Sequence, residues 1–243
     1  MQYTESECWG FRRLDFKFRD RVAMVILPKE GTSNGKGVIK TEYFGAFPDT
    51  QIEMLKRGYT FCFNENRNRW GTKEDLEDKY DFIRFVAEEF NLDPKFSMIG
   101  MSCGGMYAIQ LTALHPDCAS VLYLDAPVVN FLSCPCGMGV AELPDSMFEE
   151  IHRAYGMTKS QLLSYRNHPL DNIPKLIEHD IPVVMVYGDS DKTVPYVENG
   201  AHLEAYYKAH GGKLLVIGKE GCDHHPHGLT DPTPILDFID RHA

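Results

Sequence analysis

Gly100-Met101-Ser102-Cys103-Gly104 stands between a short apolar run at 95–99 and a longer apolar run that ends at Leu114. The first run predicts a strand, and the second predicts a helix that begins near Gly104. A G-x-S-x-G stretch at a strand-to-helix turn is typical of a nucleophile elbow, which holds a serine hydroxyl out of the sheet on a strained turn. The glycines allow the strand and helix backbones to approach closely. We therefore expect Ser102 to be a nucleophile, with the N–H of Cys103 placed at a helix N-terminus to stabilise an oxyanion.

A serine hydroxyl needs a general base, and the base needs an orienting acid. Two later strand-like runs, at 183–187 and 214–217, are each followed by a loop that offers a candidate. The first loop contains Asp191, and the second contains His224. Because loops at the carboxyl ends of parallel strands meet at one edge of a sheet, we expect these side chains to lie beside Ser102.

Two other carboxylates are alternatives to Asp191 as the acid. Asp189 lies in a Gly-Asp-Ser stretch, where an aspartate usually serves the turn itself. Asp125 ends another strand-like run, at 120–124, and is a candidate either for the acid or for contact with substrate. Trp70 is a second candidate for contact with substrate.

The elbow, the Gly-x-x-Asp-x-x-Val-Pro stretch at 188–195 and a histidine after the last strand together resemble the α/β-hydrolase superfamily. The resemblance covers the whole chain. It implies that Asp191 is the acid and His224 the base. It also implies a second oxyanion donor in the loop that ends at Pro48, with the N–H of Ala46 as first choice and that of Gly45 as second.

A closer resemblance is to bacterial serine esterases that often accompany polysaccharide breakdown. The stretches at 43–48, 124–128 and 224–227 are similar to that group, although its members commonly have glycine where this chain has Asp223. This resemblance implies an ester substrate, with acetyl on a carbohydrate as the expected case.

The alternation of predicted elements indicates one α/β-hydrolase domain over residues 1–243. Two strands are expected between Gly10 and Pro28, and strands then alternate with helices. This order predicts a mostly parallel central sheet with an antiparallel edge and helices on both faces. The segment 128–176 has no strand pattern, so we expect a small cap insertion with helices near 146–155 and 160–165.

Composition excludes several classes of partner. A formal net charge of −10 argues against nucleic acid and anionic membrane surfaces. No apolar run approaches the roughly 20 residues that cross a bilayer. The first residues are too polar for a signal peptide, so a cytoplasmic protein is expected unless a leader has been removed. Seven cysteines without a framework spacing predict reduced thiols.

Three histidines within four residues, His224, His225 and His227, raise the possibility of a zinc site. Pro226 interrupts the run, and a complete serine set needs no metal, so we expect no metal or other cofactor. The remaining two histidines are then expected to pack or hydrogen bond around the base. Cys134 and Cys136 form a close pair, but this segment offers too few further ligands for a metal knuckle.

Together, these features predict a serine carboxylesterase that hydrolyses small acyl esters through an acyl-enzyme. Its expected partner is a small-molecule or oligosaccharide ester, and the oligomeric state stays open. A short cap predicts a preference for acetyl over octanoyl groups. Three alternatives remain: a serine peptidase of the same fold, an acyl-CoA thioesterase, and a non-catalytic ligand-binding protein.

Overall fold

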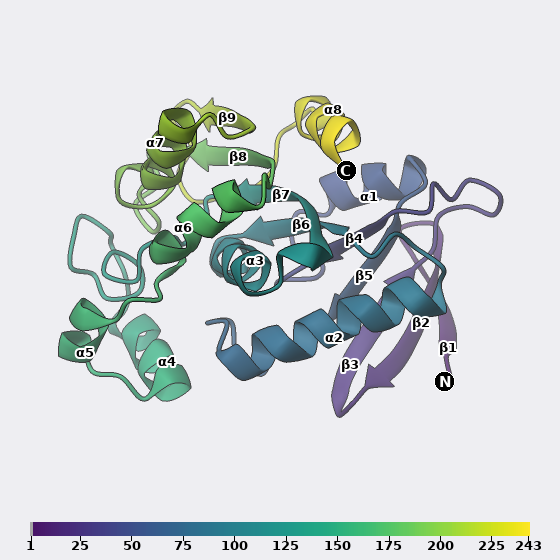
Figure 1. The fold of residues 1–243 in the computed structure, drawn as a ribbon, viewed down its shortest axis with the longest axis horizontal. Coiled ribbons are helices and arrows are strands. Elements are labelled where there is room, and N and C mark those ends of the chain that lie inside the picture. Colours follow the sequence, from purple (N-terminus) through teal and green to yellow (C-terminus); the bar gives the residue numbers. More distant parts are fainter. Residues whose placement is uncertain (1) are drawn as a thin grey trace.

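The computed structural model describes residues 2–243, in which nine strands form one sheet with helices on both faces (Figure 1). The spatial order is β1-β2-β3-β5-β4-β6-β7-β8-β9. Neighbours from β1 to β5 are antiparallel, and those from β5 through β4 to β9 are parallel. The expected α/β fold, mostly parallel with an antiparallel edge, is thus confirmed. The strands are β1 (Thr4–Cys8), β2 (Phe11–Phe18), β3 (Arg21–Ile26), β4 (Gly37–Lys40), β5 (Thr60–Asn64), β6 (Phe96–Met101), β7 (Ala119–Asp125), β8 (Val183–Gly188) and β9 (Leu214–Lys219).

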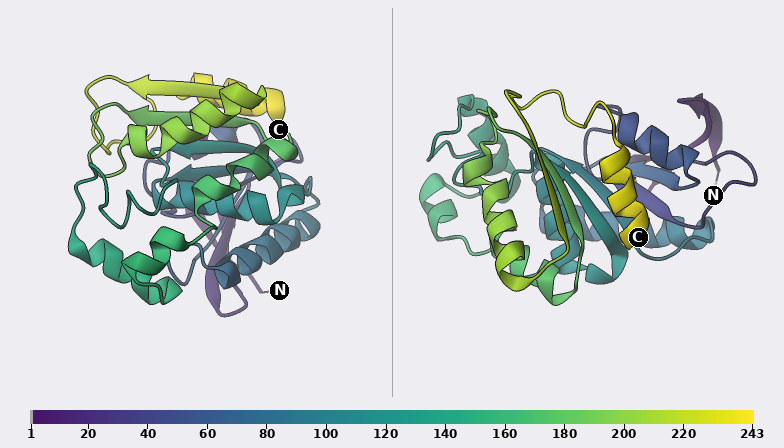
Figure 2. Two further views of the ribbon diagram at one scale, coloured as in Figure 1. Left: turned by 60° about the vertical axis from the view of Figure 1, so that its left-hand side comes forward. Right: turned by 90° about the horizontal axis from the view of Figure 1, so that it is seen from above.

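The helices cover the two faces of the sheet unequally. α2, α3, α6 and α7 lie on one face, whereas α1 and α8 lie together on the other (Figure 2). Two short 3₁₀ turns, at 116–118 and 196–198, complete the described elements. The helices are α1 (Asp49–Lys56), α2 (Lys73–Glu89), α3 (Cys103–Leu114), α4 (Asp145–Tyr155), α5 (Lys159–Ser164), α6 (Pro169–Glu178), α7 (Gly200–His210) and α8 (Thr233–His242).

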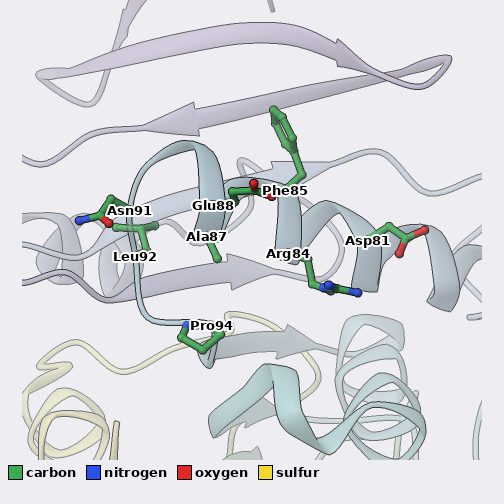
Figure 3. A pocket seen from close by; sticks show the side chains of 8 residues that line it. All are labelled: Asp81, Arg84, Phe85, Ala87, Glu88, Asn91, Leu92 and Pro94. Atoms are coloured by element: carbon green, nitrogen blue, oxygen red, sulfur yellow. The ribbon is translucent and has the colours of Figure 1, made fainter.

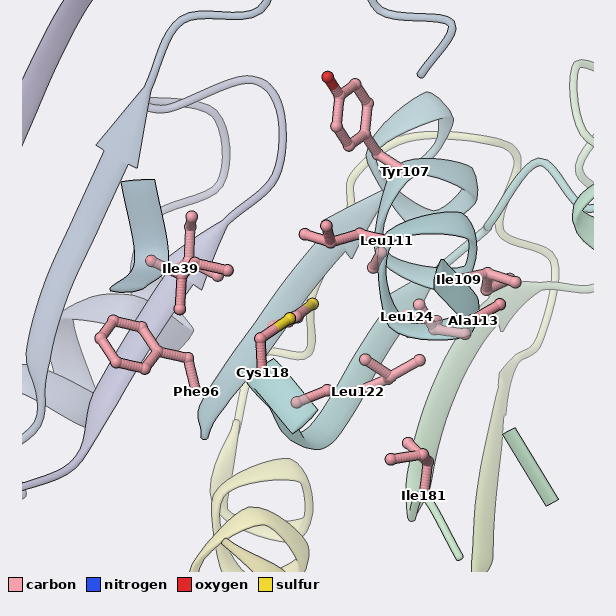
Figure 4. Packing of buried hydrophobic residues seen from close by; sticks show 14 of the residues in the cluster. Ile39, Phe96, Tyr107, Ile109, Leu111, Ala113, Cys118, Leu122, Leu124 and Ile181 are labelled. Atoms are coloured by element: carbon pink, nitrogen blue, oxygen red, sulfur yellow. The ribbon is translucent and has the colours of Figure 1, made fainter. Parts of the chain in front are cut away.

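The larger hydrophobic core lies between the sheet and the four-helix face. α3 is central to it, because nearly every residue of this helix is buried between the sheet and its neighbours α2 and α6. Figure 4 shows Ile109 and Leu111 of α3 near Leu122 and Leu124 of β7. Burial of apolar surface on this scale is the main force that fixes the elbow to the middle of the sheet.

Two elements were not expected from the sequence. β1 is a polar strand at the edge of the sheet, paired with β2 from Thr4↔Asp15 to Cys8↔Phe11. An edge strand with an exposed face carries little hydrophobic pattern. α6 contains Pro174, and a proline inside a helix breaks the usual sequence signal.

The expected cap segment, 128–176, divides in the structure. α4 and α5 stand away from the sheet beyond the end of α3 (Figure 1). α6, by contrast, packs along α3 and α7 as part of the helical layer. No helix in the described part of the chain combines the length and the apolar character needed to cross a bilayer.

Candidate active site

Ser102 occupies the turn between β6 and α3 in a strained conformation, with φ 52° and ψ −121°. A positive φ is costly for a residue with a Cβ atom and persists only where the surroundings enforce it. Here the Ser102 N–H donates to the Asp125 carbonyl at 2.9 Å, and the Ser102 carbonyl accepts from the Val128 N–H at 3.0 Å. A Cβ atom on Gly100 would lie 2.6 Å from the Gly104 carbonyl oxygen, so glycine is required for this close approach.

The structure brings together the three residues expected to act on the bond. His224 Nε2 lies 3.1 Å from Ser102 Oγ, and His224 Nδ1 lies 2.7 Å from Asp191 Oδ2. Asp191 Oδ1 accepts the backbone N–H groups of Thr193 and Val194 at 2.9 and 2.8 Å. The carboxylate therefore fixes the imidazole with Nδ1–H as donor and leaves Nε2 free to accept the serine proton.

Asp189, the first alternative acid, serves the loop in which it lies. Its exposed carboxylate accepts the Gly221 N–H at 2.8 Å and the Ser190 hydroxyl at 3.0 Å. These bonds tie the loop after β8 to the loop after β9. They correspond to the turn chemistry expected for this position.

Asp125, the second alternative, contacts a different histidine. Its Oδ1 lies 2.7 Å from His227 Nδ1, and its Oδ2 accepts the Gly228 N–H at 2.7 Å and the Tyr123 hydroxyl at 2.8 Å. Burial is the largest single influence and raises the pKa of Asp125, but the hydrogen bond and charge of His227, the Gly228 N–H and the charge of Lys219 together lower the pKa by more, so the net shift is downward. The side chain is almost sealed and does not line the pocket at Ser102. The expectation that it contacts substrate is therefore not met.

Two side chains donate hydrogen bonds to the backbone of the loop that is expected to supply the second oxyanion donor. Lys40 Nζ donates to the Ala46 carbonyl, and Gln51 Nε2 donates to the Phe44 carbonyl at 3.0 Å. Lys40 is fully buried, and burial lowers its pKa to about 7. The Ala46 N–H donates to the Tyr43 carbonyl at 3.0 Å within the same turn. That N–H is therefore engaged within the turn, although Ala46 lines the pocket with Ser102, and Ala46 as the donor stays a prediction.

Tyr43, at the start of the same turn, also lines this pocket. Its Oη accepts from Arg69 Nη1 at 3.5 Å, and its hydroxyl also forms a hydrogen bond with the Cys103 side chain. Burial raises the pKa of Tyr43, which keeps the hydroxyl protonated. The Tyr43 backbone lies in the left-handed region, with φ 56°, which is uncommon for a residue other than glycine. The sequence did not single out Tyr43, because an aromatic residue after a buried strand usually belongs to the hydrophobic core.

The first candidate oxyanion donor, the Cys103 N–H, lies at the start of α3. Cys103 is the first residue of that helix, so its N–H has no acceptor within the helix. Burial raises the pKa of the Cys103 thiol, which keeps it a neutral side chain. The backbone of Cys103, and not its sulfur, is thus the group suited to the reaction.

The pocket at Ser102 has a volume of about 300 Å³. Arg69 enters it from the loop after β5 and forms a two-pronged ion pair with Glu150 of α4, at 2.8 and 3.0 Å, which links this loop to the cap. The residues that line the pocket are Tyr43, Ala46, Phe47, Arg69, Met101, Ser102, Cys103, Cys134, Met147, Thr193, His224, His225 and His227.

Trp70 lies outside this pocket. Its side chain is 1% exposed and packs in an apolar cluster with Cys103, Met106 and Phe131. The prediction that Trp70 binds substrate is therefore not met, because the residue belongs to the core beneath the cap.

A second, larger hollow of about 660 Å³ lies at the C-terminal end of α2 (Figure 3), and Ser102 is not among the residues that line it. Among the described residues that line it, including Arg84 and Glu88, there is no histidine, serine or cysteine. Its Asp81 and Glu88 carboxylates have no serine, cysteine or histidine beside them in this lining, so the smaller pocket, which contains Ser102 and His224, is the candidate active site.

No family model matches the sequence. Three solved structures are similar to nearly the whole chain: a protein described as a dipeptidyl aminopeptidase IV from Bacteroides ovatus (TM-score 0.73, 13% identity), a puromycin-hydrolysing peptidase of Mycobacterium tuberculosis (0.71, 14%) and the acylaminoacyl peptidase of Pyrococcus horikoshii (0.68, 12%). They match 99%, 96% and 92% of this chain, respectively, which in turn covers only 36%, 38% and 38% of theirs. At these identities the likeness concerns architecture. The sheet order, the elbow and these neighbours agree that the chain has the α/β-hydrolase fold.

Proposed function

We propose that this chain is a serine hydrolase in which Ser102 is the nucleophile, His224 the general base and Asp191 the orienting acid. The observation that carries the proposal is the continuous path Ser102 Oγ–His224 Nε2 and His224 Nδ1–Asp191 Oδ2, of 3.1 and 2.7 Å, at the wall of a pocket. Geometry of this kind is what a serine needs to become nucleophilic.

The reaction follows from the positions of these groups. Ser102 Oγ attacks the carbonyl carbon while His224 Nε2 takes its proton. The oxyanion accepts hydrogen bonds from the Cys103 N–H and the Tyr43 hydroxyl. The tetrahedral intermediate collapses, His224 protonates the leaving group, and an acyl-serine remains. Water, deprotonated by His224, then attacks the acyl group, and the acid is released as His224 returns the proton to Ser102 Oγ.

Among the bonds that this site could cleave, an amide or peptide bond has the most support. The three similar structures are all described as peptidases, and this favours a serine peptidase over an enzyme confined to esters. Because the chain spans less than two fifths of each of them, their substrates are not carried over. A small peptide or aminoacyl amide fits a pocket of about 300 Å³. Arg69 can donate to a carbonyl oxygen or carboxylate of such a substrate.

A small acyl ester is the second candidate, supported by the modest pocket volume. A cavity near the lower end of the usual range for ligand sites, about 300–1,000 Å³, accommodates acetyl more readily than octanoyl groups. An acetylated carbohydrate rests on the local sequence resemblance alone. A thioester substrate would use the same groups.

The deciding experiment compares turnover of aminoacyl p-nitroanilides with that of p-nitrophenyl acetate, butyrate and octanoate, using Ser102→Ala as the blank. Because esters are intrinsically more reactive, ester turnover alone does not separate the two classes. Anilide cleavage that disappears in Ser102→Ala supports the peptidase assignment. Ester or acetyl-oligosaccharide cleavage without anilide cleavage supports an esterase, and acyl-CoA hydrolysis a thioesterase. Failure of a fluorophosphonate to label Ser102 would refute catalysis by this site.

A further inference from the structure

Three imidazoles form a compact cluster beside Ser102. The ring centroids of His224, His225 and His227 are 4.8, 4.9 and 5.0 Å apart, and the ring planes cross at 76–79°. One ring nitrogen from each lies within 4.8 Å of the others. Three imidazoles on one tetrahedral zinc ion, with Zn–N bonds of about 2.0–2.1 Å, have ring centres roughly 5 Å apart. The rings therefore already have nearly the spacing that such an ion requires.

Two of the three imidazoles are oriented by buried carboxylates. His224 Nδ1 lies 2.7 Å from Asp191, and His227 Nδ1 lies 2.7 Å from Asp125. Each carboxylate side chain is 1% exposed. A carboxylate that holds Nδ1–H leaves Nε2 as the free lone pair, and this carboxylate–histidine pairing is the arrangement that orients histidines in zinc sites. The serine triad uses one such pair, whereas the Asp125–His227 pair has no part in the proposed reaction.

His225 is the third candidate ligand and the adjustable one. It is exposed, and its ring lies against Phe47 with centroids 5.6 Å apart. An exposed imidazole can change rotamer at little cost, so it can close the remaining ångström or so toward the other two nitrogens. All three histidines line the same pocket, which gives an ion a route from solvent.

We propose that His224, His225 and His227 form an inhibitory site for a divalent transition-metal ion, represented by Zn²⁺. An ion on His224 Nε2 occupies the lone pair that would accept the Ser102 proton, so the metal-bound protein is inactive. Imidazole ligands select zinc-like ions, whereas Mg²⁺ prefers oxygen and does not bind here. The inhibition rests on the proposed serine-hydrolase function, but the metal binding does not.

The test measures binding and inhibition separately on the full chain after treatment with a chelator. Competition with a chromophoric zinc chelator should show one Zn²⁺ per chain in the wild type and equally in Ser102→Ala, which cannot turn over substrate. His225→Ala should weaken binding at least about tenfold, because a ligand is lost, and His227→Ala should do the same. p-Nitrophenyl acetate hydrolysis should fall as Zn²⁺ binds, recover with EDTA, and be insensitive to Mg²⁺.

Two control variants locate the ion. His202→Ala removes an exposed histidine on α7, and Cys134→Ser removes a thiol that lines the pocket; both should bind Zn²⁺ as the wild type does. The exposed His225 carries the test if His227→Ala folds poorly, as judged by circular dichroism. Absence of stoichiometric binding at micromolar Zn²⁺ overturns the inference, as does binding that depends on Cys134 instead of His225. Histidine-dependent binding in a protein without hydrolytic activity supports the metal site and counts against the proposed function.

Discussion

His227 and Asp125 are joined by a hydrogen bond of 2.7 Å, the same length as the bond between His224 and Asp191. The chain thus has two buried aspartate–histidine pairs in contact, with the two imidazoles 4.9 Å apart between centroids. Only His224 lies within hydrogen-bond distance of Ser102 Oγ in the described structure. This difference, and not the chemistry of the pairs, separates their proposed roles.

The first prediction compares the two acids. Asp191→Asn should lower kcat by about 10²–10⁴-fold, because the amide no longer holds His224 in the acceptor tautomer. Asp125→Asn should lower kcat much less but should reduce the free energy of unfolding by about 1–3 kcal/mol, because buried hydrogen bonds are disturbed. Kinetics and urea unfolding of both variants test this, with Asp189→Asn as the exposed control. A larger kcat loss in Asp125→Asn would transfer the acid role to that residue.

The second prediction concerns the nucleophile. Ser102→Ala should lower kcat at least about 10³-fold, because the atom that forms the acyl-enzyme is absent. The folded structure should be retained, since only one hydroxyl is removed. Mass spectrometry after fluorophosphonate treatment should find the adduct on Ser102 in the wild type and on no residue in the variant.

The third prediction concerns the oxyanion. Tyr43→Phe should lower kcat by about 10²–10³-fold with a small change in KM, as expected for a donor used mainly in the transition state. Tyr187→Phe, which alters a hydroxyl outside the pocket, should retain wild-type kcat. Wild-type kcat in Tyr43→Phe would assign the second donor to the backbone of the loop, with Gly45 next in line.

The fourth prediction concerns the elbow. Gly100→Ala should destabilise the protein by about 1–3 kcal/mol, because its Cβ would overlap the Gly104 carbonyl oxygen at 2.6 Å. Gly45→Ala is the matched control, since a Cβ there meets no atom within 4 Å in the described structure. Thermal unfolding of both variants measures the difference. Equal midpoints would show that the β6–α3 contact tolerates a methyl group.

The fifth prediction concerns the buried amine of Lys40, which bonds to the Ala46 carbonyl. The pKa of Lys40 falls from 10.5 to about 7 on folding, so the unfolded chain binds more protons between these values. The free energy of unfolding should therefore rise with pH from about 7 to 10 relative to Lys40→Met, by on the order of 4 kcal/mol at most. Below about pH 7 both states are protonated and the difference should be constant. Urea unfolding at pH 6, 7, 8 and 9 checks the slope, and parallel curves would refute it.

Local sequence determined the elbow and the elements around it. The G-x-S-x-G stretch and the flanking apolar runs specify strand, turn and helix within some twenty residues, and the structure has β6, Ser102 at positive φ and α3 there. Such features depend on covalent geometry and on periodicity of neighbours. β1 and α6 escaped this reasoning because an edge strand is polar and Pro174 obscures a helix.

Only the tertiary structure decided which polar groups meet. Ser102 and His224 are 122 positions apart, and Asp125 and His227 are 102 apart, so no local pattern distinguishes the aspartate that each histidine contacts. The same holds for the Ala46 N–H, which bonds to the Tyr43 carbonyl, and for the Tyr43 hydroxyl, which lies in the pocket beside Arg69, because neither contact is visible in the sequence. The sequence by itself identified Ser102 as the candidate nucleophile and limited its candidate acid and base to a few residues. Packing of loops from five strands at one edge of the sheet selected among them, because a hydrogen bond depends on tenths of an ångström that sequence spacing does not encode.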